Sequence, residues 1–177
     1  MADGLTQQQY LTLFIDRMMN GVCDGIDGLT DDELHFRAHE NCNSIGFEAW
    51  HVFRTADNIV HFVFEREQPV WLQQGLHEQW GLPKVAQGTS MDPADAHALR
   101  FPSSAALAQY GRDVLAAVVL RVEAMDDDYL AVVQTVTPWG DITRLEAIGQ
   151  TLISHGNAHL GQIDIARTIV GKQGLGF

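Results

Sequence analysis

The sequence has few cysteines, few basic residues and no long apolar run. Its two cysteines, Cys23 and Cys42, belong to no CxxC motif and are too few for a disulfide framework, so we interpret both as small packing residues. Lys and Arg number 11 against 23 Asp and Glu, a net charge of −12, unlike proteins that bind phosphate backbones or anionic membranes. No apolar run approaches the ~20 residues of a membrane span, and the first residues lack a signal-peptide pattern. We therefore expect no nucleic-acid partner, no membrane partner and a cytoplasmic location.

The 177 residues, 46% apolar and 19% charged, predict a single globular domain over residues 1–177. Apolar residues recur at helical spacing in four long segments that begin near Thr6, Ser44, Ser103 and Thr143. These segments end near residues 25–28, 67, 126 and 170. Thr6 and Thr143 each precede a Gln or Glu by three positions, which is the capping-box pattern.

The connections between these segments differ greatly in length. Residues 68–102 carry repeated Pro and Gly and predict a long irregular crossover between the second and third long helices, with short helical turns near 69–75 and 92–98. Residues 30–34 predict a short capped turn, residues 129–136 a short extended piece, and residues 138–141 a turn. The pattern as a whole predicts an all-α fold, a four-helix bundle.

Eight histidines are present, and three of them suggest a metal site. His155 and His159 are four residues apart on the last predicted helix, so they lie on one face and can bind one ion. This spacing also arises by chance, and a third ligand from another helix would strengthen it. His51, near the start of the second long helix and at the edge of its apolar stripe, is the best candidate. For the other five we expect packing at the surface or in loops: His35, His39, His61, His77 and His97.

Three neutral imidazoles on one divalent ion leave coordination positions open, which is typical of a catalytic site. Such an ion can polarise an oxygen, lower the pKa of a bound water, or hold a thiol as thiolate. Zinc suits imidazole ligands, and nickel, iron or copper also fit.

Three stretches resemble the DinB-like superfamily, the damage-inducible four-helix metalloproteins that include thiol-dependent S-transferases and a maleylpyruvate isomerase. Residues 43–57, NSIGFEAWHVFRTAD, are similar to the family's SIAW…WHxxRxxD opening of the second helix. Residues 139–143, WGDIT, resemble the turn into the last helix, and residues 155–164, HGNAHLGQID, resemble the HxxxHxGQ/E signature. The matches follow the family order along the whole chain. The resemblance implies an up-down-down-up bundle, often dimeric, with a metal triad at His51, His155 and His159.

The reaction is less constrained than the site. The resemblance and the open site favour a thiol S-transferase that joins a low-molecular-weight thiol to an electrophilic small molecule. A metal-dependent hydrolase is the alternative, although residues 156–158 hold no Glu of the HExxH kind that could act as base. A third alternative is a non-catalytic, stress-related metal-binding module that acts as a dimer.

Five further residues are candidates for supporting roles. Asn58 and Gln162 are candidates to line the pocket or to hydrogen-bond the ligands, or else they are satisfied polar groups at the bundle edge. Arg54 and Asp57, three residues apart, predict an ion pair, and Trp139 is a candidate for the rim of the site.

Overall fold

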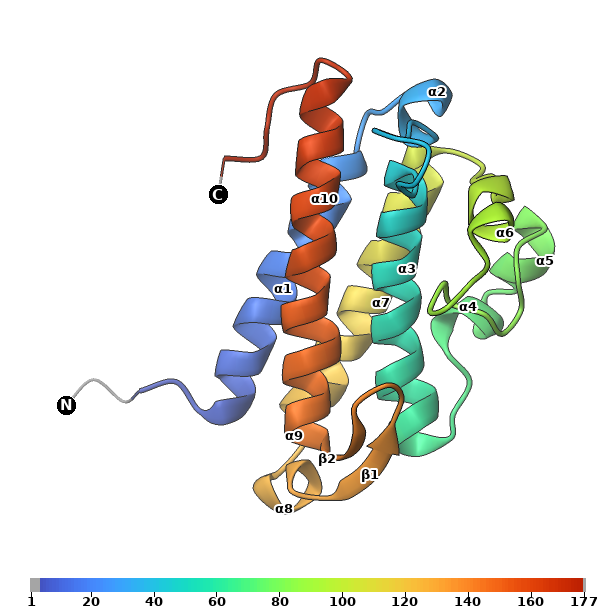
Figure 1. Cartoon of the computed structure of the whole chain (residues 1–177). Helices are drawn as coiled ribbons and strands as arrows, with labels where there is room; N and C mark the ends of the chain where they lie inside the picture. The colour runs from blue at the N-terminus through green and yellow to red at the C-terminus, as the bar shows by residue number, and fades with distance from the viewer. Residues whose placement is uncertain (1–3, 177) are drawn as a thin grey trace.

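The computed structural model describes residues 4–176, and it is mostly helical with one small two-stranded sheet (Figure 1). The first half contains α1 (Gln7–Ile26), α2 (Asp31–Leu34), α3 (Ile45–Asp57), the π-helical turn η1 (Asn58–Val63), α4 (Val70–Gln73), α5 (Leu76–Trp80) and α6 (Pro93–Ala98). The second half contains α7 (Ser104–Glu123), α8 (Asp127–Leu130), β1 (Val133–Val136), β2 (Gly140–Thr143), α9 (Arg144–Ala147), the π-helical turn η2 (Ile148–Ser154) and α10 (His155–Ile169).

Four long helical segments lie side by side around a common core. They are α1, α3 with η1, α7, and the run from α9 through η2 to α10. α1 and α3 each pack against both α7 and α10, and Figure 1 shows α1 and α10 rising while α3 and α7 descend. Ile15, Phe53, Leu107 and Ile163, one from each segment, are completely buried. Among residues 4–176, no helix combines the length and the apolar character needed to cross a membrane.

The helix starts follow the local sequence signals. Thr6, Thr30 and Thr143 each form a complete capping box with the residue three positions later, which confirms the predicted starts of α1, α2 and α9. Ser44 and Ser103 cap α3 and α7 through their hydroxyls. The four long helical segments predicted from the sequence are therefore confirmed within a few residues.

Two features differ from the expected all-α fold. Residues 133–143 form an antiparallel hairpin, in which Val133 pairs with Thr143 and Val136 with Gly140, whereas the sequence predicted only an extended piece and a turn. The second and fourth long helices also contain the π-helical turns η1 and η2. Such turns are frequent at functional sites, and η2 directly precedes His155.

Close helix packing next to His155 depends on a glycine. A Cβ on Gly156 would lie 2.6 Å from the sulfur of Met18 on α1, far inside normal contact distance. Gly156 therefore lets α10 approach α1, and this contact fixes the depth at which the neighbouring His155 lies in the fold.

The long crossover, residues 68–102, is attached to the helices by a buried carboxylate. Asp57 accepts hydrogen bonds from the backbone N–H groups of Val70 (2.8 Å) and Trp71 (2.9 Å) and from the hydroxyl of Tyr110 (2.8 Å). Burial and the charge of Asp57 raise the pKa of Tyr110 well above its usual range, so this hydroxyl remains a donor. Asp57 therefore joins α3, the start of the crossover and α7.

Candidate metal centre

His51, His155 and His159 converge although α3 and α10 lie about one hundred residues apart in the sequence. The Nε2 atom of His155 lies 3.0 Å from the Nε2 of His51 and 3.0 Å from the Nε2 of His159. The three candidate ligand atoms all lie within 4.8 Å of one another. The rings meet nearly edge to face, with interplanar angles of 75° to 85°. The structure thus brings together the three histidines that the sequence singled out.

Each of the three rings forms a hydrogen bond through Nδ1, the nitrogen that points away from the centre of the cluster. The Nδ1 of His51 bonds the carbonyl of Gln87 at 2.5 Å, and the Nδ1 of His155 bonds the carbonyl of Thr151 at 3.2 Å. The Nδ1 of His159 bonds the carboxylate of Glu48. Because these oxygens can only accept, each Nδ1 carries the proton. With the proton on Nδ1, the Nε2 of each ring is the nitrogen that faces the centre of the cluster and can bind a metal ion.

Burial keeps two of the three rings, His51 and His155, in their neutral form. Desolvation lowers the pKa of His51, with a smaller contribution from His159. Desolvation, followed by His159 and His51, lowers the pKa of His155 to about 4. Both rings are therefore neutral near pH 7, as metal ligands must be.

The donor set fits a divalent metal ion. Three lone pairs that face one another in a partly buried cluster repel unless a cation lies between them. Two nitrogens bound at ~2.1 Å to one zinc ion can be at most ~4.2 Å apart, and both 3.0 Å separations satisfy this limit. His51 is buried and the other two are half-buried, so part of the cluster is exposed to solvent.

Sequence reasoning did not identify Glu48, the carboxylate that holds His159. Its side chain is almost completely buried, and it lies one turn before His51 on α3. Metal-bound histidines commonly donate their second N–H to a carboxylate or carbonyl. The sequence offered one signal for this role. Glu48 lies in the otherwise apolar first turn of the same helix that carries His51, a candidate ligand.

The crossover supplies the support for His51. Gly88 has a φ of +101°, and a Cβ at this position would lie 2.8 Å from the Nδ1 of His51 and 2.9 Å from the ring of Phe47. Only glycine combines this backbone conformation with so close an approach. The tight turn places the carbonyl of Gln87 against the histidine.

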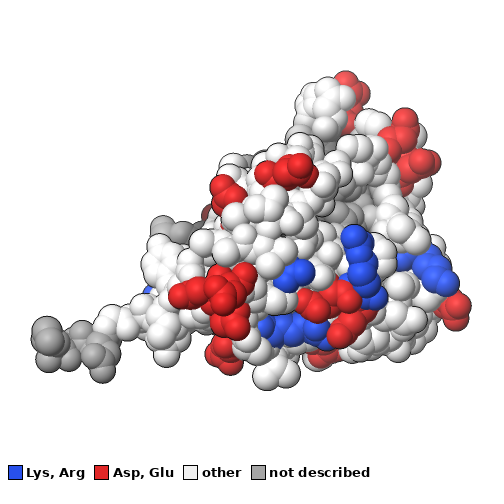
Figure 2. Space-filling view, turned by 90° about the horizontal axis from the view of Figure 1, so that it is seen from below, with Lys and Arg blue, Asp and Glu red and all other residues white. Residues whose placement is uncertain are grey.

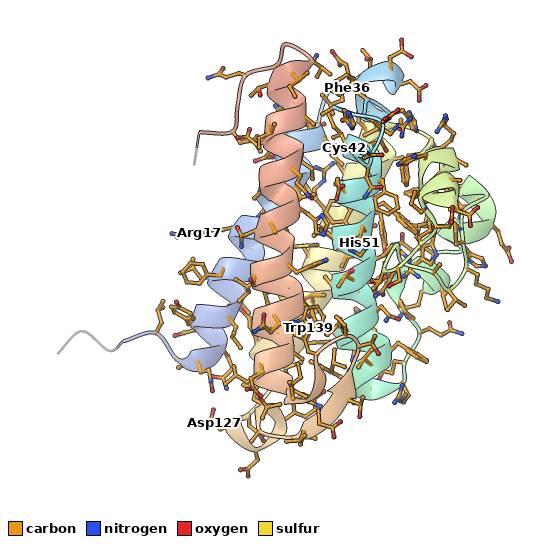
Figure 3. All side chains as sticks on the ribbon, in the orientation of Figure 1. Arg17, Phe36, Cys42, His51, Asp127 and Trp139 are labelled. Carbon is orange, nitrogen blue, oxygen red and sulfur yellow. The ribbon has the colours of Figure 1, made fainter. Side chains whose placement is uncertain are left out.

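The three other residues expected at the site lie outside the triad. Gln162 lines a cavity that it shares with Glu48. Asn58 lies half-buried at the start of η1. Trp139 is 39% exposed in the turn of the hairpin, and Figure 3 shows it nearer the hairpin end of the molecule than His51. The roles of all three at the site stay predictions.

Two expectations about neighbouring residues were wrong. His61 was expected at the surface, but its side chain is 2% exposed, and its Nδ1 lies 3.0 Å from Asp57 Oδ1. The α-helical angle used to place it does not hold across η1. Arg54 and Asp57 form no ion pair in residues 4–176: Arg54 instead donates to the carbonyl of Val85 and lies over the ring of Trp71.

The sequence pattern of the DinB superfamily matches residues 24–163. The chain therefore belongs to the DinB superfamily, as the resemblance predicted. Family membership and the three-histidine cluster together are compatible with metal binding.

Two solved structures show the same fold. A conserved protein from Enterococcus faecalis superposes with a TM-score of 0.82 at 19% identity, over 96% of this chain and 100% of that chain. An uncharacterized protein from Clostridium difficile 630 superposes with a TM-score of 0.61 at 12% identity, over 95% of this chain and 99% of that chain. No curated protein matches the chain significantly. At these identities the likeness concerns the fold alone.

Proposed function

We propose that the chain is a metal-dependent enzyme on a four-helix bundle of up-down-down-up order. One divalent ion binds to the Nε2 atoms of His51, His155 and His159. Zinc is the first candidate, and nickel or iron is the alternative. The observation that carries the proposal is the convergence of three Nε2 atoms whose rings are each anchored through Nδ1.

The reaction we propose is the transfer of a low-molecular-weight thiol to an electrophilic small molecule. The ion, when bound, supplies the charge that keeps a thiol deprotonated at neutral pH. The carbonyls of Gln87 and Thr151 and the carboxylate of Glu48 orient the three rings. Hydrolysis is less well supported, because the one carboxylate that contacts the triad among residues 4–176, Glu48, accepts a hydrogen bond from the outer nitrogen of His159, and residues 156–158 supply no general base.

Metal analysis of matched variants tests the site. We expect the purified protein to hold about one metal ion, and His155→Ala and His159→Ala to lose most of it, because two nitrogens bind far more weakly than three. His39→Ala is the control, since His39 is exposed and outside the triad. Equal metal content in all these proteins would contradict the site.

A substrate panel tests the reaction. Thiol consumption is measured with several small thiols and electrophiles on the metal-loaded protein, and ester hydrolysis is measured without thiol. Conjugation that disappears in His159→Ala supports the transferase, and ester hydrolysis that requires metal but no thiol supports the hydrolase. Full metal content with neither reaction would indicate a non-catalytic metal-binding module.

The homodimer expected from the family resemblance is part of the proposal. Sedimentation equilibrium with and without metal tests it. A dimer that dissociates on metal removal would link assembly to the site, whereas a monomer under both conditions would contradict the proposed assembly.

A further inference from the structure

A cavity lies beside the candidate metal centre, one helical turn away along both helices. Glu48 precedes His51 by three residues on α3, Gln162 follows His159 by three residues on α10, and both line this cavity. α3 and α10 run in opposite directions, so both residues lie on the same side of the triad (Figure 1). Figure 3 shows Cys42, another lining residue, above His51 near the start of α3.

The cavity is close to the size of a small-molecule site, and its wall includes Glu48, the carboxylate that holds a histidine of the triad. Its volume is about 260 Å³, slightly below the ~300–1,000 Å³ of typical ligand pockets. Glu48 forms part of its wall and also accepts the hydrogen bond of His159. A molecule in the cavity therefore contacts the carboxylate that orients one of the three rings.

The wall of the cavity has a distinctive charge pattern. Among residues 4–176, no Lys or Arg lines it, and Glu48 is the one charged residue of its wall. The polar groups are otherwise the neutral amides of Asn41, Asn43 and Gln162, which can both donate and accept hydrogen bonds. The remaining wall is mostly apolar, with Ile165 among its side chains. A carboxylate or phosphate placed here would face the carboxylate of Glu48 and find no basic side chain in the wall to pair with.

We propose that this cavity binds the uncharged, amide- or hydroxyl-bearing part of the substrate, and that it discriminates against substrates that carry a carboxylate or phosphate there. The link to the triad rests on the proposed function, whereas the charge preference of the cavity does not. The substrate would thus enter with a neutral, partly apolar portion beside Gln162 and its reacting atom toward His159.

The rate at which the Cys42 thiol reacts with neutral and charged reagents measures this charge preference directly. Iodoacetamide and iodoacetate react identically: the thiolate sulfur forms a bond to the CH₂ carbon, the C–I bond breaks and iodide leaves. The reagents differ by one negative charge. Cys42, interpreted from the sequence as a packing residue, is instead exposed in the cavity wall. Cys23 is buried as expected, and burial raises the pKa of its thiol to about 12, so Cys42 alone reacts in the folded protein.

We expect the rate ratio of iodoacetamide to iodoacetate at Cys42 to be about threefold or more above the ratio for the urea-unfolded chain, as for one like charge several ångströms away. The ratio is measured on the metal-loaded full chain and again after chelation, which removes the positive charge beside Glu48, and the expected ratio applies to the chelated protein. A ratio equal to that of the unfolded chain would overturn the proposal.

A matched pair of variants distinguishes the effect of charge in the cavity wall from the effect of the protein's net charge. Gln162→Lys adds a positive charge to the wall, and Asn157→Lys adds the same charge at an exposed position of α10 outside it. We expect Gln162→Lys to return the ratio toward the unfolded value and Asn157→Lys to leave it nearly unchanged. Equal effects would refute the proposal, because the ratio would then report net charge alone. Metal content is measured on the same proteins before chelation: the expected raised ratio in a protein that holds no metal would contradict the proposed function and support the cavity's preference.

Discussion

Substitution of Gly88 by alanine tests whether the crossover holds a metal ligand in place. The new Cβ would lie 2.8 Å from the Nδ1 of His51, whereas ordinary contacts begin at 3.4 Å, so the ring or the loop must move by about 0.6 Å. That displacement exceeds the tolerance of ~0.5 Å within which functional groups must be held. It also disturbs the hydrogen bond from His51 to the carbonyl of Gln87.

The expected loss follows from the role of that hydrogen bond. Removal of the group that orients a metal-bound histidine typically lowers metal affinity 10–100-fold, which corresponds to about 1.4–2.8 kcal/mol. The φ of +101° adds a separate cost of about 1–3 kcal/mol to the folded state, because alanine is strained there. We therefore expect Gly88→Ala to lower both metal affinity and stability.

Gly81→Ala is the matched control within the same crossover. Its φ is +63°, also unfavourable for alanine, yet a Cβ there would meet nothing within 4 Å. We expect this variant to lose stability by about 1–2 kcal/mol and to keep its metal affinity. Affinity is measured by competition with a chromophoric chelator, and stability by urea unfolding of the metal-free proteins. If both variants bind metal as tightly as the unmodified protein, the crossover does not position His51.

Three other predictions concern buried groups. Glu48→Gln keeps an acceptor for His159 but removes the charge, so metal affinity should fall about tenfold in the chelator assay; unchanged affinity would remove Glu48 from the site. N-ethylmaleimide at pH 8 should add one label to the native chain and two after unfolding, since Cys23 stays protonated with its pKa raised to about 12; two labels on the native chain would contradict this. Asp57→Asn places an NH₂ group among N–H and O–H donors, and the unfolding free energy should fall by about 3 kcal/mol or more, against about 1–2 kcal/mol for Tyr110→Phe. Equal losses, measured by urea unfolding, would show that Asp57 does not organise this contact.

The sequence predicts those parts of the fold that short-range chemistry determines. The capping boxes at Thr6, Thr30 and Thr143 identify helix starts because both partners lie three residues apart. His155 and His159 are recognisable as a pair because one helical turn separates them. The third candidate ligand, His51, is recognisable from its place at the edge of an apolar stripe and from the family resemblance.

The missed features depend on partners that are distant in the chain. Glu48 contacts His159 across 111 positions, and Gln87 contacts His51 across 36, so no local pattern reveals either contact. The burial of His61 was missed for a different reason. A constant 100° per residue holds for an α-helix, but a π-helical turn contains more residues, so angles extrapolated from His51 fail beyond the start of η1.

The separation of the ligands along the chain has a consequence for biosynthesis. His51 is made early, but its partner nitrogens belong to His155 and His159, more than one hundred residues later. During synthesis α1, α3 and α7 can begin to pack before α10 exists, and at that stage only one of the three nitrogens is present. A metal ion that needs all three therefore binds the completed chain. Its binding energy stabilises only the state in which the last helix has docked.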